Sequence, residues 1–137
     1  NIIEVPRPNS FIPSPVGPNA EFYRWAARGE LRLQRCADCG TWRHPPRHRC
    51  ASCGSGATTW EPVSGRGHIF SWTVTHQALD PAFEVPYAVV VVELEEGPRL
   101  VASLVGLEPA ALRLDMPVVV ELDPVSDEVA LLAVRPA

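Results

Sequence analysis

Residues 36–53 read CADCGTWRHPPRHRCASC and contain all four cysteines of the 137-residue chain. Cys36 and Cys39 form one C-x2-C pair, and Cys50 and Cys53 form a second pair after ten intervening residues. Two thiolates separated by two residues can reach one metal ion from a single tight turn. Two such turns complete a closed tetrahedral shell of four sulfurs. The spacing therefore predicts a structural zinc site.

A glycine follows each cysteine pair, at Gly40 and Gly54. Glycine lets the backbone turn sharply there and direct amide N–H groups at the thiolates, which stabilises their negative charge. Iron in a rubredoxin-like site uses similar loops, so the ligand set leaves zinc or iron open. Metal-assisted hydrolysis is not expected, because four thiolates leave no free coordination position.

The start of the sequence lacks a basic segment followed by an apolar stretch, and no apolar run reaches 18 residues. We therefore expect a cytoplasmic protein without a membrane span. Thiols stay reduced in the cytoplasm, which favours metal binding over disulfides. The sequence begins with Asn1 rather than methionine, as a domain cut from a longer polypeptide would.

Charge divides the chain into two parts. Residues 1–66 carry nine arginines against five acidic residues, a net charge of +4. Residues 67–137 carry three arginines against eleven acidic residues, a net charge of −8. This contrast supports two modules. It also argues against nucleic-acid binding, because the acidic part would repel phosphates.

The first segment, residues 1–29, combines a proline-rich arm with a short helix. Prolines in residues 1–18 prevent a helix and favour an extended arm. Asn19 is the predicted N-cap of a helix that Gly29 ends. Phe22 and Trp25 lie on one face of this helix. That face either packs on the chain's own ribbon or binds a partner protein.

The remaining sequence predicts a mainly β protein. Residues 31–35 and 58–62 read as strands of a zinc ribbon spanning 30–63. The C-terminal part, 64–137, predicts a five-stranded OB-fold barrel, with a small helical insert near residues 108–114 between its third and fourth strands. Its expected strands span residues 69–75, 87–94, 100–105, 118–122 and 129–134.

Several polar residues lie between the two cysteine pairs. Arg43, Arg47 and Arg49 either bind phosphate or carboxylate groups through their guanidinium forks or are solvated loop residues. His44 and His48 are expected to be solvated, because four cysteines already fill a tetrahedral site. No Ser/His/Asp arrangement or carboxylate pair can be recognised, so we assign no catalytic residue.

An ordered set of segments resembles the DUF35 family over nearly the whole chain. The segments are GELRLQRC at 29–36, the two cysteine pairs with PPR at 45–47, SGRG at 64–67, FSWT at 70–73, PY at 86–87, MPV at 116–118 and RP at 135–136. The resemblance implies a rubredoxin-like zinc ribbon joined to an OB-fold. Of the family's functional residues, only the four cysteines carry over.

The resemblance also implies a function. DUF35 proteins are non-catalytic partners of thiolase-fold enzymes, including lipid-transfer-protein-like thiolases, and some are fused to or paired with MaoC-type enoyl-CoA hydratases. We therefore expect an accessory subunit in acyl-CoA metabolism, such as sterol side-chain degradation. Its contacts would come from the arm, the aromatic helix and the loop 77–86, with Phe83 as an apolar anchor. The alternatives are a stand-alone acyl-CoA-binding module and an iron redox protein.

Overall fold

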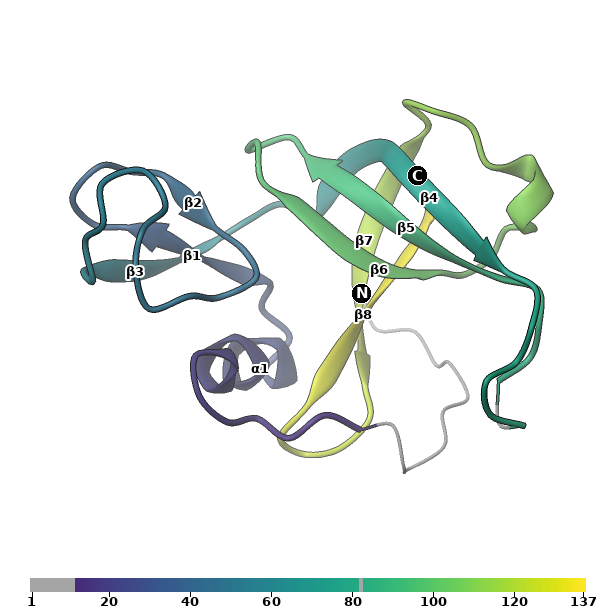
Figure 1. Ribbon diagram of the computed structural model, residues 1–137, viewed down its shortest axis with the longest axis horizontal. Coiled ribbons are helices and arrows are strands. Elements are labelled where there is room, and N and C mark those ends of the chain that lie inside the picture. The colour runs from purple at the N-terminus through teal and green to yellow at the C-terminus, as the bar shows by residue number, and fades with distance from the viewer. Residues whose placement is uncertain (1–11, 82) are drawn as a thin grey trace.

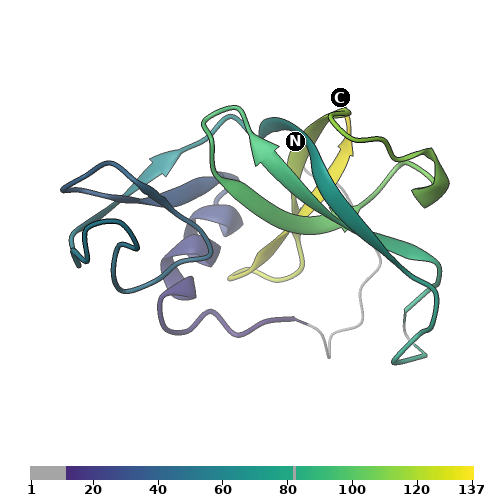
Figure 2. The same ribbon diagram turned by 45° about the horizontal axis from the view of Figure 1, so that its top comes forward.

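The computed structural model describes residues 12–81 and 83–137. A small three-stranded sheet carries the cysteine loops, a five-stranded barrel follows it, and one α-helix lies below and between them (Figure 1). Figure 2 shows the same two parts after a turn of 45°. Residues 1–11 of the predicted arm lie outside the described residues, and residues 12–16 form neither helix nor strand.

The helix α1 (Asn19–Ala27) starts differently from the prediction. Pro18, not Asn19, occupies the N-cap position, with φ −59° and no side-chain hydrogen bond. The proline ring fixes φ close to the helical value, so it can open a helix without a polar cap. Gly29 follows the C-cap residue with φ 83°, which ends the helix as predicted. No helix in the described part of the chain is long and apolar enough to cross a membrane.

The ribbon sheet consists of three antiparallel strands in the order β2-β1-β3. They are β1 (Arg32–Cys36), β2 (Trp42–Arg43) and β3 (Thr58–Pro62). The sequence predicted β1 and β3 but not β2, because two residues are too few for an alternating pattern. The guanidinium carbon of Arg35 lies 4.7 Å from the centroid of the Trp42 ring. This cation–π contact joins the paired residues of β1 and β2.

The second part is a closed barrel in the strand order β4-β5-β6-β8-β7, which confirms the predicted OB-fold. Its strands are β4 (Arg66–Thr75), β5 (Tyr87–Leu94), β6 (Arg99–Leu104), β7 (Pro117–Pro124) and β8 (Ala130–Pro136). The 3-10 helix η2 (Pro109–Ala111) lies between β6 and β7, where the helical insert was predicted. The strand β7 runs two residues beyond its expected end at residue 122, and Pro124 pairs with Ala130.

One apolar core connects the helix, the ribbon and the barrel. Ile69, Val90 and Val92 of the barrel are fully buried, and Phe22 of α1 and Leu33 of β1 belong to the same cluster. A smaller cluster fixes the end of the helix on the barrel; it contains Ala26, Leu122 and Ala130. Helix and ribbon therefore pack on the barrel rather than being joined to it by a linker alone.

Gly67 marks the point where β4 passes closest to its neighbours. It pairs with Leu94 of β5 on one side and with Val118 of β7 on the other. A Cβ atom at this position would overlap the carbonyl oxygen of Glu93 and lie 2.9 Å from a methyl group of Val92. Only glycine therefore allows this close approach of backbones.

We expect Gly67→Ala to destabilise the chain by about 1–3 kcal/mol, because the added methyl group displaces paired backbone. Urea unfolding measures the change in the free energy of unfolding. Gly56→Ala is the matched control, because the nearest atom to its added Cβ is 3.8 Å away. Equal stability of the two variants would contradict the close approach.

Candidate metal centre

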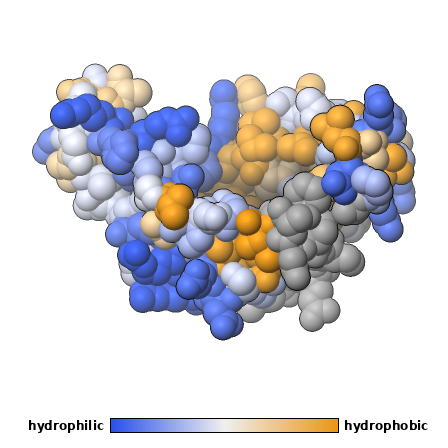
Figure 3. Space-filling model, turned by 60° about the horizontal axis from the view of Figure 1, so that its bottom comes forward, coloured by the Kyte–Doolittle hydropathy of each residue, from blue (hydrophilic) through white to orange (hydrophobic). Residues whose placement is uncertain are grey.

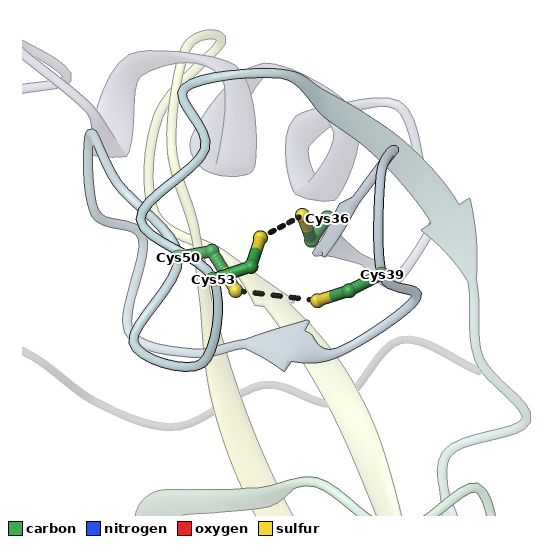
Figure 4. Close-up of side chains that lie close together, drawn as sticks. All are labelled: Cys36, Cys39, Cys50 and Cys53. Atoms are coloured by element: carbon green, nitrogen blue, oxygen red, sulfur yellow. Dashed lines mark hydrogen bonds between the residues drawn. The ribbon is translucent and has the colours of Figure 1, made fainter.

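The four cysteines come from two tight turns that face each other. Cys36 ends β1, and Cys39 lies in the turn that leads to β2. Cys50 and Cys53 lie in the second turn, between β2 and β3. Figure 4 shows the four side chains directed at one point between these turns. Cys36 and Cys50 are buried, whereas Cys39 and Cys53 are exposed.

The sulfur positions fit a tetrahedral metal ion. Cys36 Sγ lies 3.6 Å from Cys53 Sγ, and Cys39 Sγ lies 3.5 Å from Cys50 Sγ. All four sulfurs lie within 4.8 Å of one another. A zinc ion bound at about 2.3 Å from each sulfur would place sulfurs about 3.8 Å apart. These separations are too long for disulfides, whose S–S bond is about 2.05 Å.

The glycines after each cysteine pair close the turns by a different contact from the predicted one. Gly40 and Gly54 have φ angles of 78° and 75°, a region that favours glycine. Their amides donate to the carbonyl oxygens of Cys36 and Cys50, at 3.0 and 2.9 Å, rather than to sulfur. An amide within the second turn does reach a sulfur, since Ser52 N donates to Cys50 Sγ at 3.4 Å.

Backbone amides favour the thiolate form at the two buried sulfurs. The amide of Cys39 lowers the pKa of Cys36 despite burial. The amide of Cys53, followed by that of Ser52, lowers the pKa of Cys50 to about 6. Both buried cysteines therefore ionise more readily than an ordinary thiol, as a metal ligand must.

The neighbouring thiols and burial oppose ionisation of the fourth sulfur. The amide of Ser55 favours the thiolate of Cys53, but hydrogen bonding with Cys36, followed by burial and the side chains of Cys39 and Cys50, raises the pKa of Cys53 to about 12. A divalent cation supplies the positive charge that lets all four sulfurs ionise together. The donor set thus has the geometry and the charge requirement of a metal site.

The three loop arginines do not form one cluster. Arg43 is only 6% exposed, and its guanidinium donates to the carbonyl oxygens of Arg47 and Ser55, at 3.1 and 3.5 Å. Arg43 therefore connects parts of the loop through its guanidinium and is not a solvated residue. Arg47 and Arg49 are exposed, and each donates to a carbonyl oxygen of the ribbon.

Gln34 is a structural residue of this loop that the sequence did not single out. Its side chain is buried and exchanges two hydrogen bonds with the backbone of Arg47: Nε2 donates to the carbonyl oxygen at 3.0 Å, and Oε1 accepts from the amide at 2.9 Å. This pair mimics a backbone pairing and fixes the loop to β1. Gln34 occupies a polar position of the alternating stretch 31–35, so nothing in the sequence indicated that its side chain is buried.

The two loop histidines have different environments. His48 is exposed, as expected. His44 is not a solvated loop residue, because its ring packs at a tilt against Phe22, with 5.3 Å between ring centroids. Burial, followed by the positive charge of Arg47, lowers the pKa of His44 to about 4. The histidine is therefore neutral near pH 7 and packs as part of the helix–loop contact.

The aromatic residues proposed as partner contacts also have internal contacts. Phe22 is 7% exposed and belongs to the core, so it anchors the helix on its own chain. Trp25 is half-buried beneath the guanidinium groups of Arg28 and Arg32, 5.4 and 4.2 Å from the ring centroid. Phe83 packs on Tyr87, with 5.7 Å between ring centroids.

A four-cysteine ribbon followed by a closed five-stranded barrel defines the class of zinc-ribbon–OB-fold proteins. Residues 26–59 match the family described as "ChsH2, rubredoxin-like zinc ribbon domain". Residues 60–123 match "ChsH2, C-terminal OB-fold domain". A solved structure, "Ltp2-ChsH2(DUF35) aldolase", contains a chain that is 41% identical, with a TM-score of 0.81 over 90% of this chain and 98% of that one. The chain belongs to the DUF35 family, as its sequence predicted.

Two curated relatives are considerably longer than this chain. A "Probable enoyl-CoA hydratase alpha subunit" of Thermomonospora curvata is 42% identical over 96% of this chain but only 42% of its own length. The "3-oxo-4,17-pregnadiene-20-carboxyl-CoA hydratase alpha subunit" of Mycobacterium tuberculosis is 40% identical over 77% of this chain and 34% of its own length. The chain therefore spans less than half of each of these proteins.

Removing the metal should unfold the ribbon and leave the barrel folded. Of residues 37–62, only Arg43, Pro46 and Cys50 are buried, so apolar burial contributes little to this segment. Metal binding supplies about 10–16 kcal/mol in zinc-finger peptides, which is enough to fold such a ribbon. We expect a chelator to abolish amide protection in β3 but not in β5, as measured by hydrogen exchange.

The same chelator, saturated with zinc beforehand, is the control and should change nothing. Protection of β3 that persists in protein shown to be metal-free would contradict the structural role of the metal.

Proposed function

We propose that this chain is a non-catalytic accessory module that binds a thiolase-like acyl-CoA enzyme and supports its stability and substrate binding. The observation that carries the proposal is the match, over 98% of the matched chain, to the DUF35 part of an aldolase that also contains Ltp2. The DUF35 resemblance of the sequence supports the same kind of partner. The partner's substrate would be an acyl-CoA, such as a sterol side-chain thioester.

We propose that Cys36, Cys39, Cys50 and Cys53 hold one zinc ion. The zinc would be structural, because four thiolates leave no position at which a substrate or water could bind. Iron in the same sulfur shell is the alternative. Zinc predicts a colourless protein with about one zinc ion per chain by mass spectrometry. A red preparation that contains iron would contradict the assignment.

The surroundings of His68 fit a non-catalytic role. Its Nε2 lies 3.5 Å from Glu93 Oε1 and 3.9 Å from Asp115 Oδ1. His68 and Asp115 are 39% and 89% exposed. No serine hydroxyl or cysteine thiol of residues 12–81 and 83–137 is hydrogen-bonded to this histidine, so it has no nucleophile to activate.

The loop between β4 and β5 offers the clearest partner contact. Leu79 is 91% exposed, and Val85 on the same loop is 38% exposed. Phe83, which we expected as the anchor, packs on Tyr87 and so supports the loop from within. We therefore propose Leu79 as the side chain that inserts into the partner. Burial of a fully exposed leucine contributes about 1.5–3 kcal/mol.

Two further proposals remain open for this fold. The names of the two longer relatives support a hydratase, of the MaoC type implied by the family resemblance, as a second partner. Direct acyl-CoA binding by the chain alone is less well supported, because Arg43 is buried and its guanidinium is bound to backbone oxygens. Arg47 and Arg49 alone would then have to meet the coenzyme A phosphates. Calorimetry of the isolated chain with acyl-CoA compounds separates this alternative from the partner hypothesis.

We expect the chain to co-elute with Ltp2 in size-exclusion chromatography after co-expression, and Ltp2 to cleave its acyl-CoA substrate faster in its presence. Ltp2 that elutes separately, with unchanged activity and stability, would contradict the proposed function. Tight binding of acyl-CoA by the chain without Ltp2 would instead favour the alternative.

Leu79→Ser should weaken the complex with Ltp2 by about tenfold or more, because the burial of one leucine is lost. Biolayer interferometry measures the affinity, and urea unfolding checks that the variant is as stable as the parent chain. Leu114→Ser is the matched control, because Leu114 is also exposed, at 65%, but lies outside the loop. Equal affinities of the two variants would show that Leu79 is not the anchor.

A further inference from the structure

The barrel has a seam where two strands separate. β6 and β8 run parallel but pair only through Ser103 with Ala133 and Leu104 with Val134. Among the described residues, the first part of β6, residues 99–102, has no strand partner on this side, and neither has the start of β8, residues 130–132. Figure 1 shows the two strands diverging towards their N-terminal ends.

The unpaired edge of β6 presents backbone groups to this seam. Leu94 N donates to the carbonyl oxygen of Pro98 at 2.9 Å. This bond shows which residue pairs of the β5–β6 ladder are hydrogen-bonded to each other. Bonded and non-bonded pairs alternate in an antiparallel ladder. Leu100 and Ala102 therefore bond to β5, whereas the N–H and C=O groups of Val101 point into the seam.

The facing edge of β8 has the same property. Val125 N donates to the carbonyl oxygen of Val129 at 3.0 Å, which shows which residue pairs of the β7–β8 ladder are hydrogen-bonded to each other. By the same alternation, the backbone groups of Leu132 turn away from β7 and into the seam. Further along, where the strands do meet, Val105 N donates across the seam to the carbonyl oxygen of Val134 at 2.8 Å.

The seam opens into an uncharged cleft of about 450 Å³. Its walls come from α1, the ribbon loop and the barrel strands, and include Tyr23, His44, Val101 and Leu131. Figure 3 shows apolar side chains gathered around the hollow in the middle of this face. Among residues 12–81 and 83–137, no arginine, aspartate or glutamate lines the cleft, and His44 is neutral near pH 7.

The unpaired backbone groups of Val101 favour one of two kinds of molecule that could bind in the cleft. A hydrocarbon chain would fit the apolar walls but would bury the N–H group of Val101 without a hydrogen-bond acceptor, at a cost of about 1–3 kcal/mol. An extended peptide satisfies both requirements, because its backbone pairs with the strand edge while alternate side chains meet the walls. Val101 itself is 61% exposed, so its apolar side chain is open to such a contact.

We propose that this seam binds an extended segment of the partner enzyme, which adds a strand to the free edge of β6. The unpaired stretch Arg99–Ala102 has room for about four residues over roughly 13 Å. The side chains that face the cleft walls would be apolar and uncharged, because an unpaired charge there would lose its hydration. This inference rests on the proposed function and specifies how the partner is recognised.

Amide hydrogen exchange of the wild-type chain, free and bound to Ltp2, tests the proposal directly. In the free chain we expect the Val101 amide to exchange rapidly, while the amides of Leu100 and Ala102 are protected by β5. In the complex we expect the Val101 amide to become protected by about 100-fold. Unchanged exchange of Val101 in an intact complex would overturn the proposal and leave the proposed function standing.

Two substitutions at the same position separate backbone from side-chain effects. Val101→Pro removes the N–H group that points into the seam but no hydrogen bond to β5. Proline is tolerated at such positions of an edge strand. We expect this substitution to weaken the complex with Ltp2 at least about tenfold. Val101→Ile keeps the N–H group and the β-branched apolar shape, and should change the affinity by less than about threefold. Equal effects of the two variants would overturn strand addition.

Three outcomes complete the test. If Val101→Pro fails to fold, the exchange measurement on the wild-type chain decides the question. Protection of Val101 in the free chain that rises with chain concentration would show a second copy in the seam and overturn the proposal. Failure of the wild-type chain to bind Ltp2 at all would contradict both the proposed function and this inference.

Discussion

The approach of four cysteine sulfurs to within 4.8 Å is the constraint on which the front part of the molecule depends. The segment 37–62 has almost no apolar core, so we expect a metal ion at these sulfurs to supply much of its folding free energy. Once the two turns are joined, the ten residues between them must fold as a compact loop. Arg43 and Gln34 then fix that loop through hydrogen bonds to its backbone. These contacts are polar and local, and they position the loop without adding a hydrophobic core.

The consequences extend from the loop to the barrel. His44 packs on Phe22, and Phe22 is part of the core that also contains Leu33 and the inward residues of the barrel strands. The helix is therefore held from both sides, and the ribbon has a defined position relative to the barrel. A nine-residue helix is marginal by itself, so these tertiary contacts stabilise it. The same residues line part of the cleft at the β6–β8 seam, which links the cysteine loop to the proposed recognition surface.

The sequence predicted the regular parts of this structure well. Alternating or β-branched segments identified seven of the eight strands with ends within about three residues, and the cysteine spacing predicted which four side chains converge. What failed were predictions that depend on tertiary contacts. Arg43 and His44 look like solvated loop residues in a sequence, yet one binds backbone oxygens and the other packs on a helix. The start of α1 was misplaced because Pro18 replaces a polar cap. The seam could not be predicted at all, because strand pairing length is set by the curvature of the closed barrel.

An open strand edge is normally a hazard, because it offers a template for pairing with any extended chain. Proteins usually block such edges with charges, prolines or bulges. Here Pro98 and Arg99 stand at the start of the edge, whereas Leu100, Val101 and Ala102 carry none of these features. In this fold α1 and the ribbon loop line the cleft beside the edge. A partner segment bound in the proposed way would contact these walls, so its recognition would depend on the position of the ribbon. Loss of the metal would then remove a wall of the cleft as well as the fold of the ribbon, which would couple metal binding to partner recognition.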